Sequence, residues 1–365
     1  MSTVQIPSKR VSRPAARIDR PHTRPAAGNK RAGKPKRVVG VVKNSPAAVR
    51  LQRIIAFLVV AAPIVGVVIA GVQIALYGVA LWQLAVLGVM YVVSVLGVSV
   101  GYHRHFAHRS FKAQTWVRYI FGAMGSMASQ GPLLFSVAQH PPHPVYSDQE
   151  CDPHSPQLHG GGIRGMAAGL WHAHIGWMFS EETADWIHFA RDTMRDRQAW
   201  LVHRQYFFWM TAGLVLPALV GLACTGSLLG LATGFLWGGL VRMFAVNQAS
   251  WCVGSICHAF GSRPFRNQDH SANNFWVALF TFGEGLQTTP HAFPSSAAHA
   301  LRWYEPDFSI LAIRVLERIG LLWEVNTPSE RAITKAKGGV HIAPASENLP
   351  PESDDAGAAS TANES

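Results

Sequence analysis

The sequence predicts an all-α integral membrane protein whose four transmembrane helices form two hairpins. The first observation is a stretch without Asp, Glu, Lys or Arg, residues 54–102, which is long enough for two passes of about 20 residues through a hydrocarbon core of about 30 Å. The second observation is another charge-free stretch, residues 206–241. Gly78 divides the first stretch and Gly226 the second, so each is expected to turn back on itself. Apolar runs of this length are rare in soluble proteins.

The basic residues predict the orientation of these helices. The two hairpin turns carry no Lys or Arg, whereas the N-terminal tail, residues 101–205 and the C-terminal part carry nearly all of them. Because Lys and Arg collect in cytoplasmic loops, both termini and the large middle segment are expected in the cytoplasm. We therefore predict an integral protein of a bacterial inner membrane.

The two ends of the chain have opposite charge. Residues 1–50 hold thirteen Lys and Arg against one acid, Asp19, without the apolar core of a signal peptide. Residues 338–365 contain several acids and no Lys or Arg. Both ends are predicted to be disordered tails. The basic tail is expected to set the topology or to bind anionic lipid headgroups, and nucleic-acid binding is not expected because no aromatic residue precedes Phe57.

The seventeen histidines gather near the ends of the apolar stretches. One group, HRHFAH at residues 103–108, comes at the end of the second predicted span. On a regular helix His103 and His108 point about 140° apart, so they serve one metal centre only if the helix unwinds or if two metals lie between them. Histidines at a membrane boundary are also common as interfacial residues. Two shorter groups are HPPHP at residues 140–144 and QTTPH at residues 287–291.

Several long motifs point to one family. QGPLLFSVAQHPPHPVYSD at residues 130–148 resembles the acyl-CoA desaturases, a family of integral membrane di-iron enzymes. HRHFAHRSFKA at residues 103–113 and SWCVGSICHAFGSRPF at residues 250–265 resemble them too, and SANNFWVALFTFGEG at residues 271–285 leads to the place of the third histidine box. The resemblance defines residues 51–325 as a desaturase-like membrane domain. It implies four spans with a cytosolic helical cap that bears the metal-site histidines.

Some metal-ligand positions of the family are kept and others are altered. The histidines that match family ligands by position are His103, His108, His140, His143, His258 and His291. The second box ends in Pro144 where the family has histidine, and the third box has Gln287 and Pro290 in place of two further histidines. An asparagine that approaches the metal in the family is Gly254 here. The resemblance therefore implies iron, either as a di-iron centre or reduced to one ion or none.

The prolines are predicted to change the geometry of both altered boxes. Proline offers no side-chain ligand, and it moves the residue before it out of the helical region, which affects His143 and Thr289. The second box is expected to form a polyproline II helix, in which three residues advance about 9 Å, so that His140 and His143 do not share one metal. Gln287 still offers an amide oxygen, a weaker iron ligand than imidazole.

Three functions are compatible with these residues. The first is a desaturase-type oxidoreductase that uses O₂ to insert a double bond into a fatty acyl thioester at a histidine-bound iron centre. The second is a metal-depleted homologue that binds lipid or a partner enzyme without catalysis. The third is a small transporter, which the uninterrupted spans disfavour. For the first function the resemblance implies a separate electron-donor protein, a cytochrome or a ferredoxin. Four basic residues are expected to hold an anionic substrate headgroup: Arg104, Arg109, Lys112 and Arg191.

Overall fold

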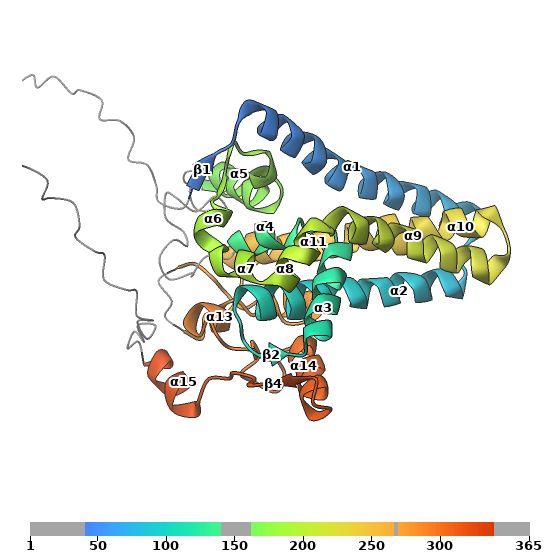
Figure 1. Ribbon diagram of the computed structural model, residues 1–365. Coiled ribbons are helices and arrows are strands. Elements are labelled where there is room, and N and C mark those ends of the chain that lie inside the picture. The colour runs from blue at the N-terminus through green and yellow to red at the C-terminus, as the bar shows by residue number, and fades with distance from the viewer. Residues whose placement is uncertain (1–40, 140–161, 266–268, 339–365) are drawn as a thin grey trace, which may run out of the picture. The chain divides into compact units, whose positions relative to one another are not determined.

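A computed structural model describes residues 41–139, 162–265 and 269–338 (Figure 1). It confirms a mostly helical chain. Four helices are long and apolar enough to cross a membrane: Pro46–Tyr77, Leu81–Ala107, Tyr206–Thr225 and Leu228–His258. The tail predicted at residues 1–50 is described only from residue 41, and the tail predicted at residues 338–365 only at residue 338.

The first two long helices are separated by a three-residue turn. α1 (Pro46–Tyr77) ends at Gly78, whose φ of 74° is a conformation that glycine adopts without strain. α2 (Leu81–Leu96) follows and continues directly into a π-helix, η1 (Gly97–Ala107). In a π-helix each backbone N–H bonds the carbonyl five residues back, so a turn contains more residues than an α-helical turn. That difference sets the direction of the histidines at the end of η1.

The second pair of long helices follows the same plan. Its elements are α9 (Tyr206–Thr225), α10 (Leu228–Gly234), the π-helix η4 (Phe235–Val241), α11 (Arg242–Ser255) and the 3₁₀-helix η5 (Ile256–His258). Gly226, with a φ of 64°, ends α9. α9 and α10 approach so closely that a Cβ on Gly221 would overlap the carbonyl oxygen of Gly230. Small residues that permit such contact stabilise helix pairs in membranes.

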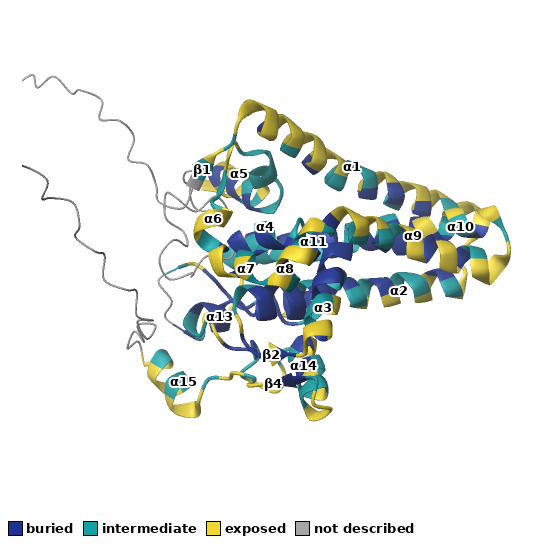
Figure 2. Cartoon of the chain, in the orientation of Figure 1, coloured by how far each residue is buried: buried dark blue, intermediate teal, exposed yellow. Residues whose placement is uncertain are grey.

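Many residues on the long helices are exposed (Figure 2), and a large share of them are apolar. On α1, Phe57, Val65 and Leu76 are 63%, 55% and 66% exposed. Soluble proteins rarely expose apolar surface of this extent, because it would remain in contact with water. This surface is the one that the lipid of a membrane would cover.

The rest of the described chain consists of short elements. The helices are α3 (Thr115–Met127), α4 (Leu133–Ala138), α5 (Gly162–His174), η3 (Gly176–Phe179), α6 (Trp186–Phe189), α7 (Arg191–Arg195), α8 (Arg197–Arg204), α12 (Phe275–Thr281), α13 (Thr288–Ala292), α14 (Phe308–Arg318) and α15 (Glu330–Lys337). Two antiparallel strand pairs connect distant parts of the sequence: β1 (Val41–Lys43) with β3 (Glu182–Ala184), and β2 (Lys112–Ala113) with β4 (Leu322–Trp323).

Two hydrophobic clusters fix the position of η1. Val100 packs in one cluster with buried residues of α3 and with Ile313 of α14. Tyr102 and Phe106 pack in the other cluster with buried residues of α4 and α8, such as Leu133. Because these side chains are almost completely buried, the backbone that carries the first histidine group is held by close packing on both α3 and α4.

Candidate metal centre

The π-helix brings the first two predicted ligands together. The backbone N–H of His108 bonds the carbonyl of His103 at 3.0 Å, a five-residue step. Such a step places the two side chains on nearly the same face. Their Nε2 atoms lie 3.0 Å apart, and their ring centroids 4.5 Å apart. The sequence left two alternatives open: a helix that unwinds, or two metals between the histidines. The structure shows the first, because the π-helix has fewer turns per residue than an α-helix and directs both imidazoles to one point.

Glu284 fixes the orientation of His103. Its Oε2 lies 2.5 Å from Nδ1 of His103, and both residues are buried. We therefore assign the proton to Nδ1 and the lone pair to Nε2. Two donors that bind one ion at about 2.1 Å lie about 3 Å apart when they subtend a right angle. This separation matches the His103–His108 distance, which is also that of a hydrogen bond between the two rings, whereas the shorter His103–Glu284 distance is an ion-pair contact.

A buried network of charges balances Glu284. Nε of Arg104 lies 3.3 Å from Oε1 of Glu284, and Nη1 of Arg104 lies 2.9 Å from Oδ1 of Asp307. The hydroxyl of Ser99 donates to the Glu284 carboxylate, and the backbone N–H of His299 donates to Asp307 at 2.8 Å. The Arg104 side chain is 0% exposed. The prediction that Arg104 holds a substrate headgroup is therefore wrong, because its guanidinium faces two buried carboxylates.

His299 lies beside this network. His103, Glu284 and His299 each offer a ligand atom within 4.8 Å of the others, and Nδ1 of His299 lies 3.3 Å from the carbonyl oxygen of Gly283. Burial, followed by the charge of Arg104, lowers the pKa of His299 to about 3. The imidazole is therefore neutral at physiological pH, which is the form that binds metals.

A second donor group lies where α13 and η5 meet. The ring centroids of His258 and His291 are 5.9 Å apart. Nδ1 of His291 donates to Asp269, and Nε2 of His291 lies 3.1 Å from Oε1 of Gln287. Burial by itself would raise the pKa of Asp269, but the hydrogen bond and charge of His291 outweigh burial and hold this pKa well below its usual value. Asp269 thus holds His291 as Glu284 holds His103.

Gln287 turns its amide oxygen toward His291. The amide Nε2 donates to the backbone carbonyl of Glu284 at 2.6 Å, which leaves Oε1 directed at the ring. When the ring is protonated, Nε2 of His291 donates to this oxygen. When the ring is neutral and Asp269 holds its proton on Nδ1, Nε2 carries a lone pair beside the amide oxygen, and the two acceptors together can bind a cation. This donor set fits a metal ion.

One prediction about the third box is wrong. Thr289 was expected to leave the helical region because Pro290 follows it, yet α13 contains both residues. α13 has only five residues, and Pro290 falls in its first turn, where a backbone N–H has no partner within the helix. The backbone of His291 therefore still bonds the carbonyl of Gln287, at 3.3 Å, and the two side chains share one face.

Two predicted ligands, His140 and His143, lie outside the described residues, as does the polyproline helix predicted for them. The other basic residues predicted to bind a headgroup are exposed. Arg109 lies 3.3 Å from Asp192, and Lys112 lies 2.7 Å from Glu324.

Exposed ion pairs of this kind contribute little to stability, so both cations remain able to exchange their partners for another anion. Arg191, the first residue of α7, is exposed as well. For these three residues the headgroup role stays a prediction.

Sequence reasoning missed Asp269 and His299. A signal existed for His299, because a histidine at the border of an apolar segment and close to a histidine box is worth testing as a ligand. No comparable signal existed for Asp269, which resembles any acid in a polar loop. Its role depends on contact with His291, 22 residues away.

The fold and the site together define a class: a membrane-embedded helical protein whose buried imidazoles, held by carboxylates, fit a metal centre. Comparison with known proteins agrees with this class. The model of the fatty acid desaturase family matches residues 80–307. The hex-5-enoyl-[acyl-carrier protein] acetylenase of Moorena producens (strain JHB) is 42% identical over 257 residues, which cover 70% of this chain and 80% of that protein.

Two further relatives are named as lipid desaturases. The sn-1 stearoyl-lipid 9-desaturase of Synechocystis sp. is 34% identical over 249 residues, 67% of this chain and 72% of the relative. The Delta-9 acyl-lipid desaturase 1 of Arabidopsis thaliana is 32% identical over 247 residues, 68% of this chain and 76% of the relative. The chain belongs to the fatty acid desaturase family, so it is an oxidoreductase of lipid metabolism that acts on fatty acyl groups.

Proposed function

We propose that this protein oxidises a fatty acyl thioester with O₂ at a histidine-bound iron centre and thereby introduces an unsaturated bond. The observation that carries the proposal is the convergence of Nε2 of His103 and Nε2 of His108 at 3.0 Å, with Nδ1 of His103 2.5 Å from the buried carboxylate of Glu284. A carboxylate on the far nitrogen and a second donor beside the near one are features of imidazoles that share a metal.

The two donor groups support a di-iron centre of unequal halves. His103 and His108 form the first half, and His258, His291 and the amide oxygen of Gln287 form the second. The halves adjoin, because Glu284 binds His103 through its side chain and Gln287 through its backbone carbonyl. Imidazole and carboxamide oxygen both suit iron. We propose that His140 and His143 complete the coordination.

Bound iron would activate O₂ for the attack on an unactivated carbon–hydrogen bond. The residues of the chain contribute orientation and exclusion of water: Glu284 and Asp269 fix the ring tautomers, and the buried side chains around η1 keep the site dry. In the overall reaction a hydrogen leaves each of two adjacent carbons. O₂ accepts these hydrogens, and two more electrons and protons from a separate cytochrome or ferredoxin reduce it fully to water.

We propose that the acyl group is carried as a thioester. The relative named for an acyl-carrier-protein substrate has 42% identity to this chain, whereas the two relatives named for lipid substrates have 34% and 32%. Arg109, Lys112 and Arg191 are exposed and would hold the anionic part of the carrier. Their exposure supports this role, since a large carrier must reach them from solution.

We also propose that the long helices cross the bacterial inner membrane as two hairpins, with both termini and the histidine-bearing cap in the cytoplasm. The turns at Gly78 and Gly226 are short and contain no Lys or Arg, which favours the side opposite the cytoplasm for both. The close approach of α9 and α10 supports the second hairpin.

The proposal is tested with purified protein in lipid nanodiscs, supplied with iron, O₂, a ferredoxin with its reductase, and an acyl thioester on either acyl carrier protein or coenzyme A. We expect a product two mass units lighter than the substrate, formed only with O₂ and absent for the His108→Ala variant. If the folded, iron-loaded protein binds the thioester but converts none of it with either carrier, the chain is a non-catalytic lipid-binding homologue and the proposal is wrong.

A further inference from the structure

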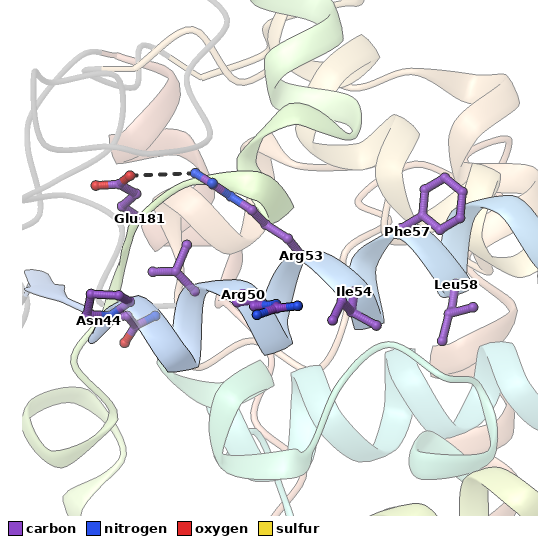
Figure 3. Close-up of a pocket in the computed structure, with 9 residues that line it drawn as sticks. Asn44, Arg50, Arg53, Ile54, Phe57, Leu58 and Glu181 are labelled. Carbon is purple, nitrogen blue, oxygen red and sulfur yellow. Dashed lines mark ion pairs between the residues drawn. The ribbon is translucent and has the colours of Figure 1, made fainter.

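A pocket lies at the start of α1 (Figure 3), and no residue of either donor group lines it. Its volume is about 500 Å³. Arg50 and Arg53 line it together with Phe57 and Leu58, and Glu181 lines it from the segment that precedes β3. None of these residues belongs to the predicted metal centre or to the predicted headgroup site, so the pocket has no role in the function proposed above.

Hydrogen bonds between distant segments build this pocket. The side-chain amide of Gln52 donates to the backbone carbonyls of Met178 and Ser180, at 2.9 and 3.1 Å. Nε of Arg53 donates to the carbonyl of Phe179 at 3.2 Å, and Asn44 donates to Gln52 at 3.1 Å. The segment around Phe179 is therefore fixed against the first turns of α1, and the pocket has a defined wall.

The charges at the pocket leave an excess of cations. Arg53 lies 3.6 Å from Glu181, and Lys43 lies 3.7 Å from the same carboxylate. Arg50 is exposed and makes no ion pair with any residue in the described part of the chain. Two cations thus share one acid, and Arg50 adds a further positive charge to the lining. A guanidinium binds phosphate through paired hydrogen bonds, so the excess positive charge favours a phosphate-bearing ligand.

The lining changes from charged to apolar along the helix. Arg50 and Arg53 precede the charge-free stretch that begins at Ile54, and Phe57 lies one turn, about 6 Å, beyond Arg53. Phe57 and Leu58 are 63% and 56% exposed. The two arginines therefore stand at the level of lipid headgroups, and the two apolar side chains at the level of the first acyl carbons. A ligand that satisfies both ends is amphiphilic.

We propose that this pocket binds one anionic phospholipid from the leaflet at the N-terminal end of α1. Its phosphate would bind Arg50 and Arg53, and its acyl chains would lie along Phe57 and Leu58. The lipid would stay intact, because the described lining contains no His, Cys or Ser that could act on it. Its effect would be to hold the start of α1 against the segment around Phe179.

The test uses delipidated protein in neutral detergent, titrated with phosphatidylglycerol or with phosphatidylcholine of the same acyl chains and observed by native mass spectrometry. We expect one retained phosphatidylglycerol and a preference over phosphatidylcholine of about tenfold, the size of one charge-assisted contact. The R50Q/R53Q variant should lose this preference, and R50K/R53K, which keeps the charge, should retain part of it. Unchanged thermal unfolding would show that the variants remain folded.

A matched control removes the same number of charges elsewhere. Arg331 and Lys335 are exposed on α15 and do not line the pocket, so R331Q/K335Q should keep the preference. Equal retention by wild type and R50Q/R53Q would overturn the proposal. An equal loss of the preference in R331Q/K335Q would overturn the proposal too, because it would indicate diffuse electrostatic attraction. Displacement of the lipid by millimolar inorganic phosphate would also overturn the proposal, because it would indicate a site for a free anion.

Discussion

The two donor groups differ in what supports them. His103 stands on a π-helix that continues a long membrane helix, and His108 caps the end of that π-helix. The π-helix is packed in two hydrophobic clusters and tied to Glu284, Arg104 and Asp307. His291 stands on a five-residue helix, and Gln287 is the residue at its N-cap. The rigid group keeps its histidines, whereas the group on the short helix has an amide and a proline where the family has imidazoles. The half of the site that stands on the short helix is thus the half whose chemistry differs.

The largest effect is expected from breaking the support of the first group. Arg104→Met removes a fully buried guanidinium and leaves Glu284 and Asp307 without this cationic partner. Breaking one partner of a buried ion pair costs about 3–5 kcal/mol. We expect a clear fall in the thermal unfolding temperature. The exposed Arg109→Met, which breaks only a surface pair, is the control and should change stability by less than about 1 kcal/mol. Equal stability of the two variants would contradict the buried network.

Removing one imidazole from each group compares their metal affinities. His108→Ala deletes a ligand of the rigid group, and His258→Ala deletes one of the other group. Loss of a supporting residue already lowers metal affinity by about 10–100-fold, so loss of a ligand should exceed about 100-fold. Metal competition with a chelator measures the effect. Retention of both metals by His108→Ala would refute the assignment of the first group.

The carboxylates give a finer comparison. Glu284→Gln and Asp269→Asn keep the size of each side chain but weaken its hold on Nδ1 of the neighbouring histidine. We expect metal affinity to fall by about 10–100-fold in each case, as for other residues that orient a ligand. Cobalt substitution with optical spectroscopy shows whether the geometry of the remaining ligands also changes. No change in affinity or spectrum would mean that the carboxylates have only a structural role.

Gln287 tests whether the amide oxygen is a ligand. Gln287→Leu should weaken the second metal by roughly tenfold, and Gln287→His should strengthen it, because imidazole binds iron more tightly than an amide does. Gln73→Leu on α1 removes a different partly buried glutamine, which bonds Gln83 and Trp237, and should leave the metals unaffected. A second metal held equally by Gln287→Leu and wild type would exclude the amide as a ligand.

The smallest effect is expected at Gly254, where the family has an asparagine. A Cβ at this position would meet only the carbonyl oxygen of Ala173, at 3.6 Å, so Gly254→Asn should fold normally and gain slightly in helix propensity, by about 0.3 kcal/mol. If the amide of the new asparagine reaches the metal, the metal affinity measured by chelator competition should rise, by at most about threefold. A drop in the unfolding temperature would show that the space is smaller than the structure indicates.

The sequence predicted the parts of this fold that depend on local pattern. Charge-free stretches located the long helices, and the glycines at 78 and 226 located two turns. The approach of His103 to His108 was left open, because a π-helix depends on packing around η1 that no local pattern encodes. The burial of Arg104 was missed for a similar reason, since its partners lie about 180 and 200 residues later in the chain.

The most direct test of the account is the iron content per chain of the detergent-purified protein, by elemental mass spectrometry, beside the His108→Ala/His258→Ala double variant. The account predicts about two irons in the wild type and their loss in the variant, with both proteins folded. One iron per chain would contradict the di-iron proposal and leave the group of His103 and His108 as the candidate site. No iron in folded protein reconstituted with excess iron, or equal iron in both proteins, would contradict the claim that these histidines form a metal centre.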